Sequence, residues 1–230
     1  MDISKLTIDA IIFDFDGVIV DTEPIHFRAF QRILEPLELG FTWQDYVDVY
    51  MGFDDRDAFK AAFAAHNKQL TSDDLSSLIK RKAIIFQEVI ADGVVPYPGV
   101  IDFVTHLRQI QKPLAICSGA LRSDIMPILT MLGISDCFKI IITAEDVNIS
   151  KPDPASYREA FERLKMLFPI SSSPENTLAI EDTPAGIQSA KGVGLTVAAV
   201  TNSYDRQDLT SADIIVPSLI SLRDAINTTP

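Results

Sequence analysis

The segment AIIFDFDGVIVDT, which begins at Ala10, constrains the fold more than any other part of the chain. Four apolar residues run directly into Asp14, and a second acid, Asp16, is followed at once by Gly17. An apolar run bounded by a turn residue is typical of a fully buried strand. Because a carboxylate in the middle of such a strand would be costly, both acids are expected at its carboxyl end. In open α/β sheets that end faces the crevice where ligands bind, so the sequence predicts a functional site around Asp14.

The composition limits the classes of partner. The chain has 230 residues, 47% of them hydrophobic and 23% charged, which is ordinary for a globular protein with a core. Its formal net charge of −12 argues against a nucleic-acid or anionic-membrane surface, since either needs clustered Lys and Arg. An anionic substrate is compatible with this charge, because a local site can be positive on an acidic protein. We therefore expect no nucleic-acid and no membrane partner.

Three further observations bear on the cellular compartment and on the role of the two cysteines. Residues 1–6 lack the basic and apolar regions of a signal peptide, and no apolar stretch approaches the roughly 20 residues that span a bilayer. Cys117 and Cys137 are too few and too far apart for a zinc site or a disulfide framework. We expect a cytoplasmic protein in which both cysteines belong to the core.

Residues 22 to about 93 have a helical apolar pattern, and strands are hard to find there. Two segments in this region, TWQD at 42–45 and TSDD at 71–74, have the form of a capping box with Asp in place of the usual Glu. Each predicts the start of a helix. Gly40 and the region of Gly52 predict turns between helices.

Strand and helix signals alternate after the segment PYPG at 96–99. Strands are predicted over 113–117, 138–142, 177–180, 195–200 and 214–216, and helices over 100–110, 125–132, 155–167, 185–191 and 219–226. Such alternation implies a parallel sheet with right-handed crossovers. The predicted organisation is an α/β catalytic core of residues 1–21 and 95–230, interrupted by an all-helical domain over 22–94.

Four short motifs lie where predicted strands end: DFDG at 14–17, CSGA at 117–120, SKPDP at 150–154 and EDTPAG at 181–186. Because a parallel sheet gathers its strand ends at one edge, the four motifs can converge. Together they supply carboxylates, one hydroxyl and one lysine. Taken singly, each has a plainer interpretation, as a turn with solvated acids, a generic turn, a surface loop or a helix cap.

The combination fits phosphoryl transfer. Mg²⁺ prefers a few carboxylate oxygens together with water and substrate phosphate. A lysine supplies a compact positive charge for phosphate oxygens, and Ser118 with nearby backbone N–H groups can donate hydrogen bonds to them. One carboxylate can attack phosphorus. A second can protonate the leaving oxygen and later deprotonate a water molecule.

These motifs resemble those of the haloacid dehalogenase superfamily, in the branch with a helical cap inserted after the first strand, and within it the β-phosphoglucomutase-like phosphatases. The family motif Asp-x-Asp-Gly-Val-x-x-Asp-[Ser/Thr] is matched by residues 14–22. Its strand-two Ser or Thr matches Ser118, its lysine Lys151, and its acidic pair residues 181–182. The resemblance covers nearly the whole chain and implies a Rossmann-like parallel-sheet core with an inserted helical cap.

The resemblance also implies roles for the acids. Asp14 would be the nucleophile and a magnesium ligand. Asp16 would be the general acid and base, with its backbone carbonyl on the metal. Asp182 would be a metal ligand, and Glu181 a direct or water-mediated one. The implied cofactor is Mg²⁺.

The phosphate site would be formed by Ser118, with Gly119 beside it, and by Lys151, which joins Asp14 and Asp16 in catalysis. Asp16, the second acid of the first motif, also separates reaction classes, because the dehalogenases of the superfamily lack an acid at this position. An alkoxide leaving group needs a proton and a halide does not. Asp16 therefore favours phosphate chemistry.

Three residues outside these motifs have two open interpretations each. In β-phosphoglucomutases a histidine at the position of His26 helps to gate the acid/base aspartate, but a half-exposed helix histidine fits equally. Arg56 either reaches a distal anion of the substrate or is a solvated residue at a helix start, and Arg122 has the same two readings. Residues 43, 46 and 50 are aromatic at helical spacing and are expected in the core of the cap.

The core motifs do not separate a phosphatase from a mutase, since both pass through the same phospho-aspartate. β-Phosphoglucomutases commonly carry Gly-x-Ser-Arg in the cap turn, where this chain has GFDDR at 52–56, and a polar stretch after the strand-two serine, where it has GALR at 119–122. Both departures favour a phosphatase. The runner-up is a β-phosphoglucomutase-type phosphosugar mutase, and a second alternative is a non-catalytic binding protein on the same fold.

We therefore expect a Mg²⁺-dependent phosphohydrolase that acts through an aspartyl-phosphate. Its expected partner is a small phosphorylated metabolite, with a sugar phosphate as the nearest candidate class. A monomer is the default expectation.

Overall fold

The computed structural model describes residues 7–51, 53 and 55–227, and the chain folds into two compact units. One, here called the α/β unit, comprises Met1–Asp21 and Val95–Pro230. The other, the helical unit, comprises Thr22–Val94. Each unit has its own core and is described by itself below.

The α/β unit is built on a parallel sheet with the strand order β3-β2-β1-β4-β5-β6. The strands are β1 (Ala10–Phe13), β2 (Leu114–Cys117), β3 (Ile140–Ile142), β4 (Thr177–Glu181), β5 (Thr196–Val200) and β6 (Ile214–Val216). All pairs of neighbouring strands are parallel. Because Phe13 is in register with both Ile116 and Ile180, the ends of β1, β2 and β4 lie side by side. The predicted α/β class and parallel sheet are confirmed.

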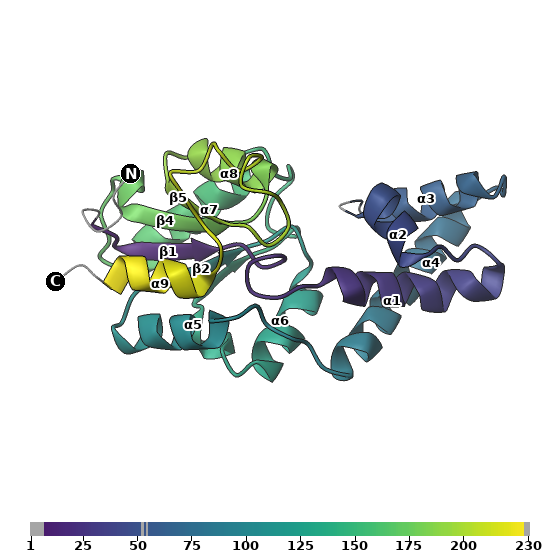
Figure 1. Ribbon diagram of the computed structural model, residues 1–230, viewed down its shortest axis with the longest axis horizontal. Coiled ribbons are helices and arrows are strands. Elements are labelled where there is room, and N and C mark those ends of the chain that lie inside the picture. The colour runs from purple at the N-terminus through teal and green to yellow at the C-terminus, as the bar shows by residue number, and fades with distance from the viewer. Residues whose placement is uncertain (1–6, 52, 54, 228–230) are drawn as a thin grey trace. The chain divides into compact units, whose positions relative to one another are not determined.

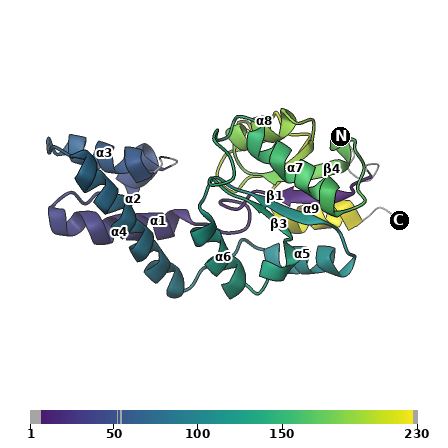
Figure 2. The ribbon, with the colours of Figure 1, turned by 180° about the vertical axis from the view of Figure 1, so that it is seen from behind.

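Helices cover both faces of this sheet (Figures 1 and 2). They are α5 (Val100–Gln109), α6 (Arg122–Met131), α7 (Ala155–Leu167), α8 (Pro184–Lys191) and α9 (Leu219–Asn227), with the 3-10 turns η4 (Ser135–Cys137) and η5 (Pro174–Asn176). On one face, Ile12 of β1 belongs to the buried cluster that holds Phe161 of α7 and Ile187 of α8. On the other, Phe13 meets Phe103 of α5 edge to face, with 6.0 Å between ring centres.

The helical unit consists of α1 (Glu23–Leu34), η2 (Glu35–Leu37), α2 (Trp43–Asp45), η3 (Tyr46–Tyr50), α3 (Asp55–Ala65) and α4 (Ser72–Ala91), and its described residues contain no strand. Thr42 and Asp45 form a capping box in which each side chain bonds the other's backbone N–H. Thr71 likewise accepts a hydrogen bond from the backbone N–H of Asp74 at 3.1 Å. Both predicted helix starts are confirmed.

Two details of the helical unit differ from the sequence predictions. Tyr46 and Tyr50 are buried as predicted, but the side chain of Trp43 is 42% exposed, so its assignment to the core was wrong. Trp43 lies at the start of the capped turn, where its ring packs against Phe27 and Tyr46 but stays partly open to solvent. The helix after Thr42 also widens into a π-helix, η3, within one turn. The turn predicted at Gly52 lies outside the described residues.

Smaller differences concern the α/β unit. The strand predicted from residue 138 begins at Ile140, because η4 precedes it and Phe138 instead packs edge-on against Phe13, with 5.8 Å between ring centres. Both cysteines are buried and free, as predicted. None of the helices in the described part of the chain is long and apolar enough to cross a membrane.

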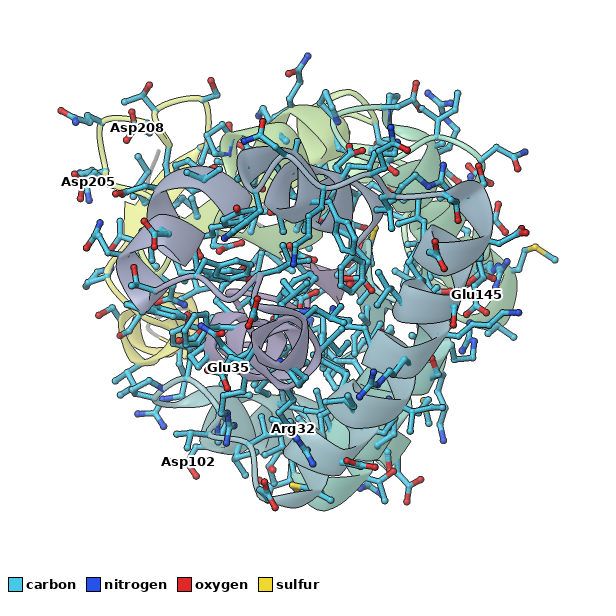
Figure 3. All side chains as sticks on the ribbon, turned by 90° about the vertical axis from the view of Figure 1, so that its right-hand side faces the viewer. Arg32, Glu35, Asp102, Glu145, Asp205 and Asp208 are labelled. Carbon is cyan, nitrogen blue, oxygen red and sulfur yellow. The ribbon has the colours of Figure 1, made fainter. Side chains whose placement is uncertain are left out.

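Exposed acids account for much of the negative charge. Figure 3 labels Glu35, Asp102, Glu145, Asp205 and Asp208, whose side chains project from the ribbon toward solvent. Solvated acids of this kind cost the folded protein little free energy. The acids at the ends of β1 and β4 differ from them, because they are buried.

Candidate active site

The described motifs converge at one edge of the sheet. Asp14 follows β1, Ser118 follows β2, and Glu181 is the last residue of β4. β1 lies between β2 and β4, so the three strand ends are neighbours. Lys151, on the loop between β3 and α7, reaches the same place, with its Nζ 2.9 Å from Oδ1 of Asp14. The sequence motifs therefore form a single site.

Asp14 is held rigidly at the end of its strand. Its backbone N–H donates to the carbonyl oxygen of Ile180 at 2.9 Å, and its side chain is buried. Burial and the neighbouring carboxylate of Glu181 raise the pKa of Asp14 well above its ordinary value, while Lys151 works in the opposite direction. Ionisation of the Asp14 carboxyl group therefore depends on nearby cations.

Asp16 and Gly17 form the turn after Asp14. Gly17 has φ of +75°, and an added Cβ would lie 1.8 Å from Oδ2 of Asp182, so no side chain fits there. Asp16 is half-buried, and its Oδ2 accepts a hydrogen bond from the hydroxyl of Ser118 at 3.3 Å. The turn therefore places the second acid beside the first while leaving it reachable.

Ser118 is buried, and its backbone N–H donates to the carbonyl oxygen of Ile142 at 2.9 Å. Its hydroxyl also accepts the backbone N–H of Ala120 at 2.9 Å, which curls the loop after β2. Gly119 is exposed at the tip of this curl, with open space where a side chain would stand. A ligand can therefore approach the backbone at Gly119 closely.

Lys151, whose side chain is 14% exposed, is the cation of the site. Its ammonium contacts Oδ1 of Asp14 at 2.9 Å, Oε1 of Glu181 at 2.7 Å and the carbonyl oxygen of Cys117 at 3.1 Å. Burial by itself lowers the pKa of Lys151, but the two carboxylates outweigh it and hold the pKa well above its ordinary value. Lys151 is therefore charged at neutral pH.

Asp182 faces the Gly17 turn. Burial and the neighbouring carboxylate of Glu181 raise the pKa of Asp182 to about 7, although a hydrogen bond with Ser203 acts against the shift. Its Oδ1 is buried and has no hydrogen-bond partner among the described residues. A buried oxygen without a donor is costly unless something else binds it.

A hard divalent cation fits this arrangement. Asp14, Glu181 and Asp182 each offer a carboxylate oxygen, and these atoms lie within 4.8 Å of one another. Oδ1 of Asp182 has no hydrogen-bond partner among the described residues and is available as a metal ligand. The three buried carboxylates also carry more negative charge than the one nearby lysine, Lys151, can balance. Carboxylate oxygens are the ligands that Mg²⁺ prefers.

Two residues of the site were missed by the sequence analysis. Asn202 donates from Nδ2 to the carbonyl oxygen of Gly17 at 2.6 Å, and Ser203 bonds the side chain of Asp182. Both follow β5 closely. The signal was present, because polar residues follow the predicted strand over 195–200 just as the four motifs follow theirs.

His26 and Arg56 belong to the helical unit. Nδ1 of His26 lies 2.7 Å from Nζ of Lys82, a buried lysine that also pairs with Asp55 at 2.6 Å. Burial, and then the charge of Lys82, lower the pKa of His26 well below its ordinary value. Arg56 is exposed near the start of α3. Their roles in substrate binding stay predictions.

Arg122 takes part in a network beside the loop that follows β2. Its Nη2 donates to the carbonyl oxygen of Ile141 at 2.7 Å and to Asp146 at 3.1 Å, and its backbone N–H donates to Glu145 at 3.0 Å. Arg163 also pairs with Asp146. These bonds tie the loop after β3 to α6 and α7, a task that the sequence analysis did not assign to Arg122.

Comparison with known proteins agrees with this geometry. A family model described as haloacid dehalogenase-like hydrolase matches residues 11–200. Validoxylamine A 7'-phosphate phosphatase of Streptomyces hygroscopicus subsp. limoneus is 28% identical over 212 residues, which are 92% of this chain and 94% of that protein. β-Phosphoglucomutase of Bacillus subtilis is 28% identical over 212 residues, 90% of this chain and 88% of that protein.

A solved structure has a similar fold over most of the chain. CbbY from Rhodobacter sphaeroides, a mutant in complex with xylulose-(1,5)bisphosphate, superposes with a TM-score of 0.79 at 25% sequence identity. The match covers 94% of this chain and 96% of that one.

Proposed function

Since the chain belongs to the haloacid dehalogenase-like hydrolase family, we propose that it is a phosphatase that hydrolyses a small phosphorylated metabolite in a Mg²⁺-dependent reaction through Asp14. The observation that carries the proposal is the contact between Lys151 and Asp14, 2.9 Å apart, at the edge of the sheet where Ser118 and Asp182 also lie. A nucleophile and a phosphate-binding charge are thus adjacent.

Asp14 is the proposed nucleophile. One of its carboxylate oxygens forms a bond to phosphorus while the ester P–O bond breaks, and the product is an aspartyl-phosphate. Water then attacks the same phosphorus and the bond to Asp14 breaks, which releases inorganic phosphate. The backbone hydrogen bond to Ile180 supports this role, because it fixes the attacking group on a rigid strand end.

Asp16 is the proposed general acid and base. It donates a proton to the leaving alkoxide in the first step and removes one from the attacking water in the second. Its half-buried side chain, two residues from Asp14 and held by the Ser118 hydroxyl, supports the assignment.

Ser118, the backbone at Gly119 and Lys151 would hold the transferring phosphoryl group. A preorganised ammonium and hydroxyl stabilise the negative charge on the equatorial oxygens. The three groups come from the loop after β2 and the loop before α7, so the sheet fixes where these loops begin.

Asp14, Asp182 and the backbone carbonyl of Asp16 would hold Mg²⁺, with Glu181 next to them. When bound, the metal would supply charge compensation for the phosphate oxygens and for the clustered carboxylates. The free Oδ1 of Asp182 supports this ligand set. His26 and Arg56 of the helical unit would contribute to substrate binding.

The substrate class is inferred from relatives. One relative acts on validoxylamine A 7'-phosphate, and CbbY was solved with xylulose-(1,5)bisphosphate. A phosphorylated sugar or sugar-like compound is therefore the proposed substrate class. A phosphosugar mutase is the second candidate, because of the β-phosphoglucomutase relative.

The test is incubation of the purified protein with Mg²⁺ and a panel of phosphorylated metabolites. The panel includes β-glucose 1-phosphate with a trace of glucose 1,6-bisphosphate, and both free phosphate and glucose 6-phosphate are followed. Free phosphate from one substrate or a few, absent with Asp14→Asn, supports the hydrolase. Glucose 6-phosphate without phosphate release would establish the mutase, and no turnover of any substrate would favour a non-catalytic binding protein.

A further inference from the structure

Tyr157 is a buried residue with a polar group aimed at the site. It lies in the first turn of α7 with 0% of its surface exposed. Its hydroxyl donates to Oε1 of Glu181 at 2.7 Å, and Nζ of Lys151 lies 5.1 Å from the centre of its ring. Packing alone would be satisfied by phenylalanine, so the hydroxyl needs another explanation.

Glu181, the acceptor of this bond, is saturated with donors. Oε1 accepts from Lys151 and Tyr157, both at 2.7 Å. Oε2 accepts from the hydroxyl of Thr183 at 3.2 Å and from the backbone N–H of Asp182 at 3.3 Å. A carboxylate accepts about four hydrogen bonds, so little capacity is left for another ligand.

The surroundings also fix Glu181 in place. The side chain is fully buried, and a Cβ added to Gly186 would lie 2.0 Å from its carboxylate oxygens. The first turn of α8 therefore packs directly against the carboxylate. In contrast, Oδ1 of Asp182 has no donor among the residues that the structure describes. The two acids of this pair thus differ in what they can bind.

The ammonium of Lys151 makes three close contacts: hydrogen bonds to Glu181 and to the carbonyl oxygen of Cys117, and an ion pair with Asp14. To bind a phosphoryl group, it must give up one of them. In the proposed reaction Asp14 becomes bonded to phosphorus, which makes it the partner to be exchanged. Glu181 is then the anchor that remains.

We propose that Tyr157 is a positioning residue for Lys151: its hydroxyl orients Glu181, and Glu181 anchors the ammonium in the phosphate site instead of binding the metal directly. This inference rests on the proposed function, since it assigns Lys151 to phosphate. It names a residue of α7 that touches neither phosphate nor metal.

The experiment compares Tyr157→Phe with the wild-type protein by isothermal titration calorimetry. Inorganic phosphate is titrated in the presence of Mg²⁺, and Mg²⁺ is titrated separately without phosphate. We expect the affinity for phosphate to fall by about tenfold or more, because the variant loses a hydrogen bond to a charged group that anchors Lys151. The affinity for Mg²⁺ should stay within about twofold.

The matched control is Tyr204→Phe, which removes the hydroxyl of an exposed tyrosine in the same unit and should change neither affinity. A second variant, Glu181→Gln, and its combination with Tyr157→Phe complete a double-mutant cycle. We expect the double variant to bind phosphate no more weakly than Glu181→Gln alone, because Tyr157 acts through Glu181.

Three results with the variants would overturn the inference. These are an unchanged phosphate affinity in Tyr157→Phe, a loss of Mg²⁺ affinity in place of phosphate affinity, and fully additive losses in the double variant. A wild-type protein that binds no phosphate would also overturn it. Failure of the proposed function is a separate result, namely a wild-type protein that hydrolyses no phosphate ester even though the Tyr157 variant binds phosphate less tightly.

Discussion

Nζ of Lys151 lies 2.9 Å from Oδ1 of Asp14, so the positive charge of the site is in contact with the proposed nucleophile. The contact keeps a buried carboxylate from standing unpaired. It also means that a phosphoryl group bonded to Asp14 would arrive beside a cation already in position, with no need for a side chain to move in from solvent.

Replacing Asp14 with asparagine should abolish turnover and leave the fold intact. The amide cannot form the phosphoryl bond, and the loss should be at least about 10⁴-fold in kcat, as for removal of other catalytic nucleophiles. Thermal melting in Mg²⁺-free buffer should show no loss of stability, because burial and Glu181 disfavour the charge that the substitution removes. Asp136→Asn, at an exposed site, is the control. An Asp14→Asn protein that keeps its activity without deamidation would disprove the nucleophile assignment.

Asp16→Asn should slow both chemical steps, by roughly 10²–10⁴-fold for an alkyl phosphate. With p-nitrophenyl phosphate the leaving group needs no proton, so only the hydrolysis of the aspartyl-phosphate should be slow. Rapid-mixing absorbance should then record a burst of nitrophenolate equal to the enzyme concentration. A variant with wild-type rates on a sugar phosphate would contradict the role of Asp16.

The stability of the Mg²⁺-free protein should fall as pH rises toward neutrality. The pKa of Asp182 is raised from its ordinary 3.8 to about 7. The group therefore contributes stability that is fully present below about pH 3.8 and is lost as pH rises through about 7. Asp182→Asn should remove part of this decline.

The free energy of unfolding can be measured by urea titration between about pH 5 and 8. This range brackets the raised pKa of Asp182. Added Mg²⁺ should offset the decline in the wild-type protein, since it binds the ionised form. Equal pH profiles for the wild-type protein and Asp182→Asn would show that Asp182 does not titrate there.

Ser203→Ala should weaken metal binding. The hydroxyl bonds the side chain of Asp182, and loss of such an outer partner typically costs about 10–100-fold in metal affinity. Calorimetric titration with Mg²⁺ and the Mg²⁺ dependence of phosphate release should shift together. Ser211→Ala, at an exposed position, should leave both unchanged.

The sheet and its site could be predicted from sequence because the strands are short apolar runs, and several are followed directly by an acid or a hydroxyl residue. Thus the run before Asp14 becomes β1, and the runs before Ser118 and Asp182 become β2 and β4. The helix starts at Thr42 and Thr71 were predictable for a local reason, since each cap joins residues only three positions apart.

Contacts between residues distant in sequence escaped prediction. Nothing near Lys82 indicates that its ammonium is buried against His26, 56 positions away, or that Tyr157 reaches Glu181. The π-helix at residues 46–50 was missed as well, because its apolar pattern is compatible with an ordinary helix. Such features depend on tertiary packing, which local periodicity does not encode.

The segments just before and just after the helical unit are bonded to each other. Val20 pairs antiparallel with Pro96, and the backbone N–H of Tyr97 donates to the carbonyl oxygen of Ile19 at 3.1 Å. The α/β unit therefore closes on itself at the point of insertion, and the 22–94 segment can lengthen, shorten or be exchanged without rerouting a strand. The helical unit is thus an insertion whose length and sequence can change while the strands and the residues at their ends keep their positions.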